Sequence, residues 1–110
     1  MGHDISSFNK AGQEIGYVRF TMGDIIAPLF YDLFDANEYY AGVSGSGEVA
    51  TLPLVQVKNA LEAYDKWKAK DFGTKGSKDF LLWQRYEIQK FIETCLETAQ
   101  KEGAVKVYFG

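Results

Sequence analysis

The sequence is poor in cysteine, histidine, arginine and long apolar runs, and each shortage excludes a class of protein. The 110 residues include one cysteine, Cys95, so no internal disulfide can form. A lone thiol is typical of a reducing compartment, and we expect a cytoplasmic protein. No apolar run approaches the roughly 20 residues that span a bilayer, so we expect no membrane segment. No basic stretch precedes an apolar one at the N-terminus, so we expect no secretory signal.

The net acidic charge and the shortage of arginine and histidine point away from nucleic acid and from common enzymes. The formal net charge is −3, and there are two arginines, so nonspecific nucleic-acid binding is not expected. The one histidine, His3, lies at the N-terminus, where chains are usually loose, and Met1-Gly2-His3 could be native or left from expression. A Cys–His or Ser–His–Asp set cannot be assembled convincingly from it. We therefore expect no catalytic residues, no cofactor and no metal, and a binding protein rather than an enzyme.

The residues that are present are sufficient for one packed domain. Hydrophobic residues make up 46% of the chain and aromatic residues 15%. This composition can form a core without disulfides, and the length fits a single domain over residues 1–110. We find no internal repeat and no linker.

Three segments have the composition of β-strands. Asp4–Phe8 and Glu14–Phe20 are separated by turn-forming residues 9–13, which predicts an N-terminal hairpin. In Ala104–Phe109 the residues Val105, Val107 and Phe109 alternate, which predicts a final strand. Because its apolar side chains need the same core, we expect it to pair with the hairpin.

Three segments have helical spacing of apolar residues. Asp24 is a candidate N-cap for a first helix that fades over residues 37–40. Thr51 is predicted to cap a second helix, with Pro53 in its first turn and a breaker at residues 71–78. A third helix is predicted from about Asp79 to Lys101 and is ended by Gly103. The expected fold is α+β, with element order ββαααβ and a small antiparallel sheet covered by helices on one face.

The stretch from residue 39 to residue 48 is the candidate binding loop. It combines two tyrosines with glycines and serines, namely Tyr39, Tyr40, Gly42, Ser44, Gly45, Ser46 and Gly47. Several exposed backbone N–H groups could form a nest for phosphate or carboxylate. The spacing matches neither a P-loop nor a dinucleotide-binding motif. The loop is therefore either a flexible joint between helices or a binding site, with the tyrosines as contacts for a flat ligand or a protein.

The two arginines and an acidic series are the other candidates. Arg85 is predicted on the apolar side of the third helix, and Arg19 lies on the hairpin, so each could reach solvent, pair with a carboxylate or point at a ligand. Asp32, Asp35 and Glu38 could attract a divalent cation. A solvated helix face explains these three acidic residues more simply.

Two classes of function remain from the sequence. The first is a noncatalytic binding or regulatory domain that contacts a protein partner or a ligand through loop 39–48, with a homodimer as one arrangement. The alternative is a binder of, or enzyme on, a nucleotide or other small anionic ligand, held by the loop with Arg19, Arg85 or Lys75. A purely structural subunit is a third hypothesis, which predicts a stable oligomer.

Overall fold

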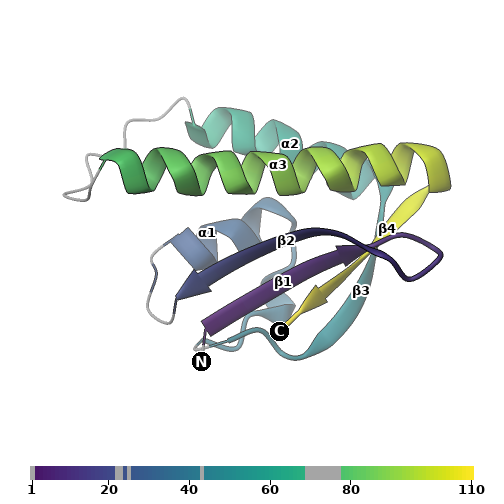
Figure 1. The fold of residues 1–110 in the computed structure, drawn as a ribbon, viewed down its shortest axis with the longest axis horizontal. Helices are drawn as coiled ribbons and strands as arrows, with labels where there is room; N and C mark the ends of the chain where they lie inside the picture. Colours follow the sequence, from purple (N-terminus) through teal and green to yellow (C-terminus); the bar gives the residue numbers. More distant parts are fainter. Residues whose placement is uncertain (1, 22–23, 25, 43, 69–77) are drawn as a thin grey trace.

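The protein forms a layer of antiparallel strands covered by a layer of helices (Figure 1). The computed structural model describes residues 2–21, 24, 26–42, 44–68 and 78–110, with side chains at all of these except 68 and 78–82. Lys75 and most of the predicted breaker at 71–78 lie outside the described residues. The predicted α+β class, with helices on one face of an antiparallel sheet, is confirmed.

The described strands form one four-stranded sheet with the order β2-β1-β4-β3. They are β1 (Gly2–Phe8), β2 (Glu14–Thr21), β3 (Glu48–Pro53) and β4 (Ala104–Phe109). The predicted hairpin is β1 with β2, and β4 pairs with β1 so that Ile5 lies opposite Phe109. The last strand therefore pairs with the hairpin, as the sequence predicts.

The described helices are α1 (Ile26–Leu33), α2 (Leu54–Lys68) and α3 (Lys78–Glu102), with a short 3₁₀ turn, η1 (Asn37–Tyr39). Figure 1 shows α3 running the length of the sheet with α2 beside it and α1 below them. None of the helices within the described ranges is long and apolar enough to cross a membrane.

Local hydrogen bonds define both ends of α1. At its start the Asp24 carboxylate accepts a hydrogen bond from the Ile26 N–H at 2.9 Å, as expected of an N-cap. At its end Asp35 adopts a left-handed backbone conformation, with φ of 52°. The Ala36 N–H then donates to the Tyr31 carbonyl at 2.9 Å, which is the bond of a Schellman motif. The helix therefore ends earlier than its apolar spacing suggests, because the chain turns at Asp35.

The core lies between the inner face of the sheet and the helices. Ile5, Val107 and Phe109 are buried on the sheet side, and Ile88 and Ile92 are buried on α3. Burying such side chains removes roughly 25 cal/mol of unfavourable hydration per Å² of apolar surface. The alternation predicted for β4 and the apolar face predicted for α3 are therefore both confirmed at these positions.

The sequence prediction is wrong at residues 48–53. Thr51 and Pro53 do not open a helix, because they belong to β3, and α2 begins at Leu54. β3 pairs with β4, with Thr51 opposite Lys106, and Ala50 and Leu52 point into the core. Pro53 is tolerated because it is the last residue of β3, an edge strand whose outward N–H groups have no strand partner. The described element order is ββαβααβ, with a fourth strand that the prediction omitted.

We expect Thr51→Val to change the free energy of unfolding by less than about 0.5 kcal/mol, because Thr51 is an exposed strand residue and valine keeps its β-branched shape. Loss of a helix N-cap would cost about 1 kcal/mol instead. Leu52→Ala, at the buried neighbouring position, should cost about 2–5 kcal/mol. Urea unfolding of both variants checks the register of β3, and a costly Thr51→Val with a mild Leu52→Ala would contradict it.

Candidate functional site

Loop 39–48 is bonded to the end of the sheet and is not a free joint. The Gly45 N–H donates to the Gly110 carbonyl at 2.9 Å, and the Gly47 N–H donates to the Phe109 carbonyl at 2.7 Å. The Ser46 N–H donates to the Tyr39 carbonyl at 2.9 Å. Three consecutive loop N–H groups that the sequence suggested as an anion nest therefore have carbonyl partners. The loop also lies between η1 and β3, not between two helices as predicted.

Gly45 is required where the loop crosses the C-terminal strand. A Cβ atom at this position would lie 2.6 Å from the backbone carbonyl atoms of Phe109 and 2.9 Å from the Tyr31 hydroxyl. Backbone atoms cannot move aside cheaply, so a larger residue is excluded at this close approach. Gly42 and Gly47 have a different role, since both have positive φ and open space around them.

His3 is buried beneath the loop, which corrects the expectation of a loose N-terminus. Its side chain is 1% exposed. Nδ1 lies 2.9 Å from the Tyr31 hydroxyl, and Nε2 lies 3.2 Å from the Gly42 carbonyl. Because a carbonyl can only accept, Nε2 carries a hydrogen and donates it to Gly42. The sequence prediction placed the start of the first strand at Asp4, whereas β1 begins at Gly2 and includes His3.

Aromatic rings hold the two tyrosines of the loop. Tyr40 stacks on His3, with ring centroids 5.5 Å apart, and meets Tyr31 edge-on at 5.2 Å. Tyr39 stacks on Phe109 at 4.9 Å. Tyr39 is half-buried and packs against the core, whereas Tyr40 remains partly exposed. Tyr39 is therefore part of the packing around the core, whereas Tyr40 is accessible to solvent.

The loop has an outer side that faces solvent. Gly42, Ser46 and Gly47 are exposed, while Ser44 is half-buried and Gly45 is buried. The exposed side continues into β3 at Val49, which lies opposite Tyr108 of β4 on the uncovered face of the sheet. The hydrogen bonds of residues 45–47 therefore anchor the inner side of this part of the loop and leave its outer side exposed.

The structure does not gather the two arginines at the loop. Arg19 lies on the uncovered face of the sheet, where its Nε is 3.7 Å from the Asp4 carboxylate, and both side chains are mostly exposed. Such a pair contributes little to stability. The Arg85 guanidinium lies 5.8 Å from the centre of the Trp67 ring, in the helical layer. A joint role of both arginines with the loop therefore has no geometric support.

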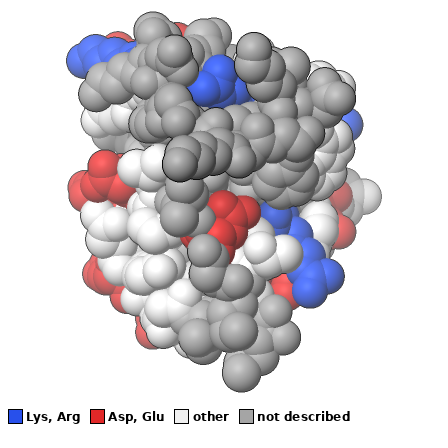
Figure 2. Space-filling model, turned by 90° about the vertical axis from the view of Figure 1, so that its left-hand side faces the viewer, with Lys and Arg blue, Asp and Glu red and all other residues white. Residues whose placement is uncertain are grey.

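Charged side chains of both signs occur on one end face of the molecule (Figure 2). Figure 2 shows acidic and basic residues interspersed over the described part of the end face. Within the described ranges, no group of three or more His, Cys, Asp or Glu side chains is placed to hold a metal ion. Asp32, Asp35 and Glu38 are exposed, and Asp32 accepts a hydrogen bond from the Asn37 side chain at 3.2 Å.

Cys95 is a core residue. Burial raises the pKa of its thiol to about 12, and the neighbouring Ser7 hydroxyl opposes that shift. Ser7 Oγ is buried and has no hydrogen-bond partner among the described residues. A thiol such as that of Cys95 is only a weak hydrogen-bond partner. A thiol with this pKa stays protonated at neutral pH and is not a nucleophile.

Comparison with protein-family models, with curated proteins and with solved structures found no match.

We expect Gly45→Ala to destabilise the protein by about 1–3 kcal/mol, because the new methyl group meets the Phe109 backbone. Ser46→Ala, at the exposed neighbour, is the matched control and should stay within about 0.5 kcal/mol. Urea unfolding measures both, and hydrogen exchange at the Gly47 amide reports whether the loop has left β4. Equal stability of the two variants would contradict the close packing of the loop.

We expect stability to fall as pH rises from about 9 to about 12. Burial raises the pKa of Tyr31 from 10.0 to about 12, and that of Cys95 from 9.0 to about 12. The unfolded chain releases these protons first, so the folded state loses relative stability over this interval. In Cys95→Ala the decline should begin near pH 10 instead of pH 9, where the tyrosine starts to titrate. Urea unfolding across this range tests it, and identical profiles for both proteins would refute the assignment.

Proposed function

We propose that the protein is a noncatalytic binding domain that contacts another protein chain through the outer side of loop 39–48 and the adjoining uncovered sheet. The observation that carries this proposal is the anchoring of residues 45–47 next to exposed apolar side chains. Tyr40 and Tyr108 are each 37% exposed, and Val49 is 58% exposed. A surface held in one shape loses little conformational entropy on binding.

The noncatalytic part of the proposal follows from how the reactive side chains are used. The Cys95 thiol is buried and has its pKa raised to about 12. Both ring nitrogens of His3 are engaged, by Tyr31 and Gly42. A nucleophile or general base must instead reach a substrate atom. Both groups serve the packing of the loop and core.

The aromatic residues suit a protein partner. Tyrosine offers a large apolar face with a polar tip, and it is enriched among residues that dominate protein interfaces. Val49 and Tyr108 are cross-strand neighbours, and Ser6 lies opposite both Tyr108 and Tyr17. Tyr17, Tyr108 and Val49 thus form an exposed row across the sheet. We propose the cytoplasm as the compartment, on the basis of the single reduced Cys95.

The alternative of a nucleotide or other small anion at the loop has no specific observation in its favour. The N–H groups of Gly45, Ser46 and Gly47 already donate to carbonyl oxygens. Arg19 is beside Asp4, and Arg85 is over Trp67. An anion at these three N–H groups would have to displace their bonds to the carbonyl oxygens.

A photo-crosslinking experiment tests the proposed surface with a matched control. Val49 and Val55 are 58% and 62% exposed, and they lie on β3 and α2 respectively. A benzophenone amino acid at Val49 or Tyr108, in cells that express the chain, should give a discrete protein adduct after irradiation. The same probe at Val55 should give none, and an adduct of twice the chain's mass would identify a homodimer.

Substitution completes the test. Val49→Lys should reduce the Tyr108 adduct by about tenfold, equivalent to about 1.4 kcal/mol, whereas Val55→Lys should leave it unchanged. Equal adducts at Val49 and Val55, or none at Val49 and Tyr108, would exclude this surface as the contact.

A further inference from the structure

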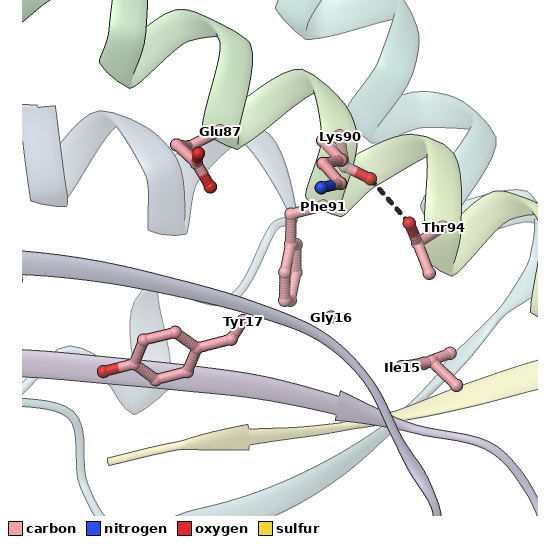
Figure 3. Close-up of a pocket in the computed structure, with 7 residues that line it drawn as sticks. All are labelled: Ile15, Gly16, Tyr17, Glu87, Lys90, Phe91 and Thr94. Carbon is pink, nitrogen blue, oxygen red and sulfur yellow. Dashed lines mark hydrogen bonds between the residues drawn. The ribbon is translucent and has the colours of Figure 1, made fainter.

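The uncovered face of the sheet carries a row of mainly exposed side chains between two rows of charge. Cross-strand pairing places Tyr17, Ser6, Tyr108 and Val49 side by side in the middle row. Side chains at opposed positions of paired strands lie on one face of a sheet. In Figure 3, which shows the pocket between β2 and α3, the Tyr17 ring lies on the side of β2 away from the helix. The middle row therefore faces away from the helical layer.

The charged rows lie on either side of the middle row. In one of them Arg19 of β2 lies opposite Asp4 of β1. In the other, Phe8 of β1 lies opposite both Glu14 of β2 and Lys106 of β4. The four charged side chains are exposed. Their two positive and two negative charges cancel, so these rows as a whole do not repel a second copy of the same face.

A two-fold axis along the middle row makes this charge pattern complementary to itself. Such an axis lies in the plane of the sheet and runs across its strands, so it turns the second copy over and reverses the strand direction. Each strand then faces the same strand of the other copy, and the two charged rows exchange places. Arg19 of each copy meets Glu14 of the other, because both belong to β2. Asp4 and Lys106 also approach across the contact, because β1 and β4 are adjacent strands.

We propose that the protein partner of this face is a second copy of the chain, related to the first by this two-fold axis. The inference rests on the proposed function and names the partner of the same surface. Tyr17, Tyr108 and Val49 of one copy lie over the same residues of the other, and the opposite charges flank them. Two-fold symmetry is the commonest symmetry of protein oligomers, and it requires a patch that is complementary to itself.

The size of the face sets the strength of the dimer. The four strands have six to eight residues each. At about 3.3 Å per residue and about 4.8 Å between strands, they cover roughly 400 Å². Two copies therefore bury about 800 Å² in total, which is the low end for specific contacts. A contact of this size is typical of transient association, so we expect a reversible dimer with a dissociation constant of roughly 100 μM.

Sedimentation equilibrium of the purified protein, from about 10 μM to about 1 mM, tests the proposal through two charge reversals. Arg19→Glu and Glu14→Arg each bring like charges together in a homodimer, so each should weaken association at least about tenfold. An equimolar mixture of the two variants should associate as strongly as the unmodified protein, because both contacts between the two different copies then join opposite charges. Both residues are exposed, so the variants should fold.

Lys58→Glu is the matched control, since it reverses an exposed charge on α2 in the helical layer and should leave association unchanged. A protein that stays monomeric at about 1 mM would overturn the dimer. A mixture that stays as monomeric as its components, or a single variant that associates like the unmodified protein, would overturn the arrangement about this axis.

These failures are distinguishable from failure of the proposed function. If the purified chain is monomeric while the probe at Val49 or Tyr108 forms an adduct with a different protein in cells, the second copy is excluded as the partner and the proposed surface stands. If neither probe forms an adduct, the surface and the dimer are both excluded.

Discussion

The pairing of β4 with β1 is the constraint on which the rest of this structure depends. β4 lies between β1 and β3, so it joins the N-terminal hairpin to the strand that follows the glycine-rich loop. At its end, Phe109 lies opposite Ile5 on one side and Glu48 on the other. The Phe109 and Gly110 carbonyls also accept the loop N–H groups of Gly47 and Gly45. The C-terminal strand thus completes the sheet, and the same residues fix the loop.

Local sequence patterns predicted the elements whose causes are local. The hairpin follows from turn residues between two strand-forming segments, α3 from a long apolar spacing, and the start of α1 from Asp24. β3 was missed because its two inward residues, Ala50 and Leu52, give a weak alternation, and because Thr and Pro also suit a helix start. Its strand character comes from β4, which lies more than fifty positions away in the sequence.

The prediction of the binding loop also failed where the partners of a residue are distant in the sequence. A loop rich in glycine and serine suggests N–H groups that can bind a ligand, but composition does not show which partners they have. Here Phe109, Gly110 and Tyr39 supply the carbonyl oxygens. His3 was expected to be loose because it is near the terminus. Its partners Tyr31 and Gly42 lie 28 and 39 positions away, so only the fold could bring them together. The aromatic character of Tyr39 and Tyr40 was readable from sequence, but not which of them would stay exposed.

Two glycines show why residue type alone does not locate a binding site. At Gly45 the nearest atoms are backbone atoms of Phe109, so the missing side chain allows two chain segments to pack, and the space is filled. At Gly16 the nearest atoms are side-chain atoms of Ser7 and Phe91, and the residue also borders a cavity. The difference follows from position in the sheet. Gly45 lies against the end of a central strand, whereas Gly16 lies in β2, which is at the edge of the sheet that the described strands form. A glycine therefore allows close packing at both positions, against backbone atoms at Gly45 and against side chains at Gly16.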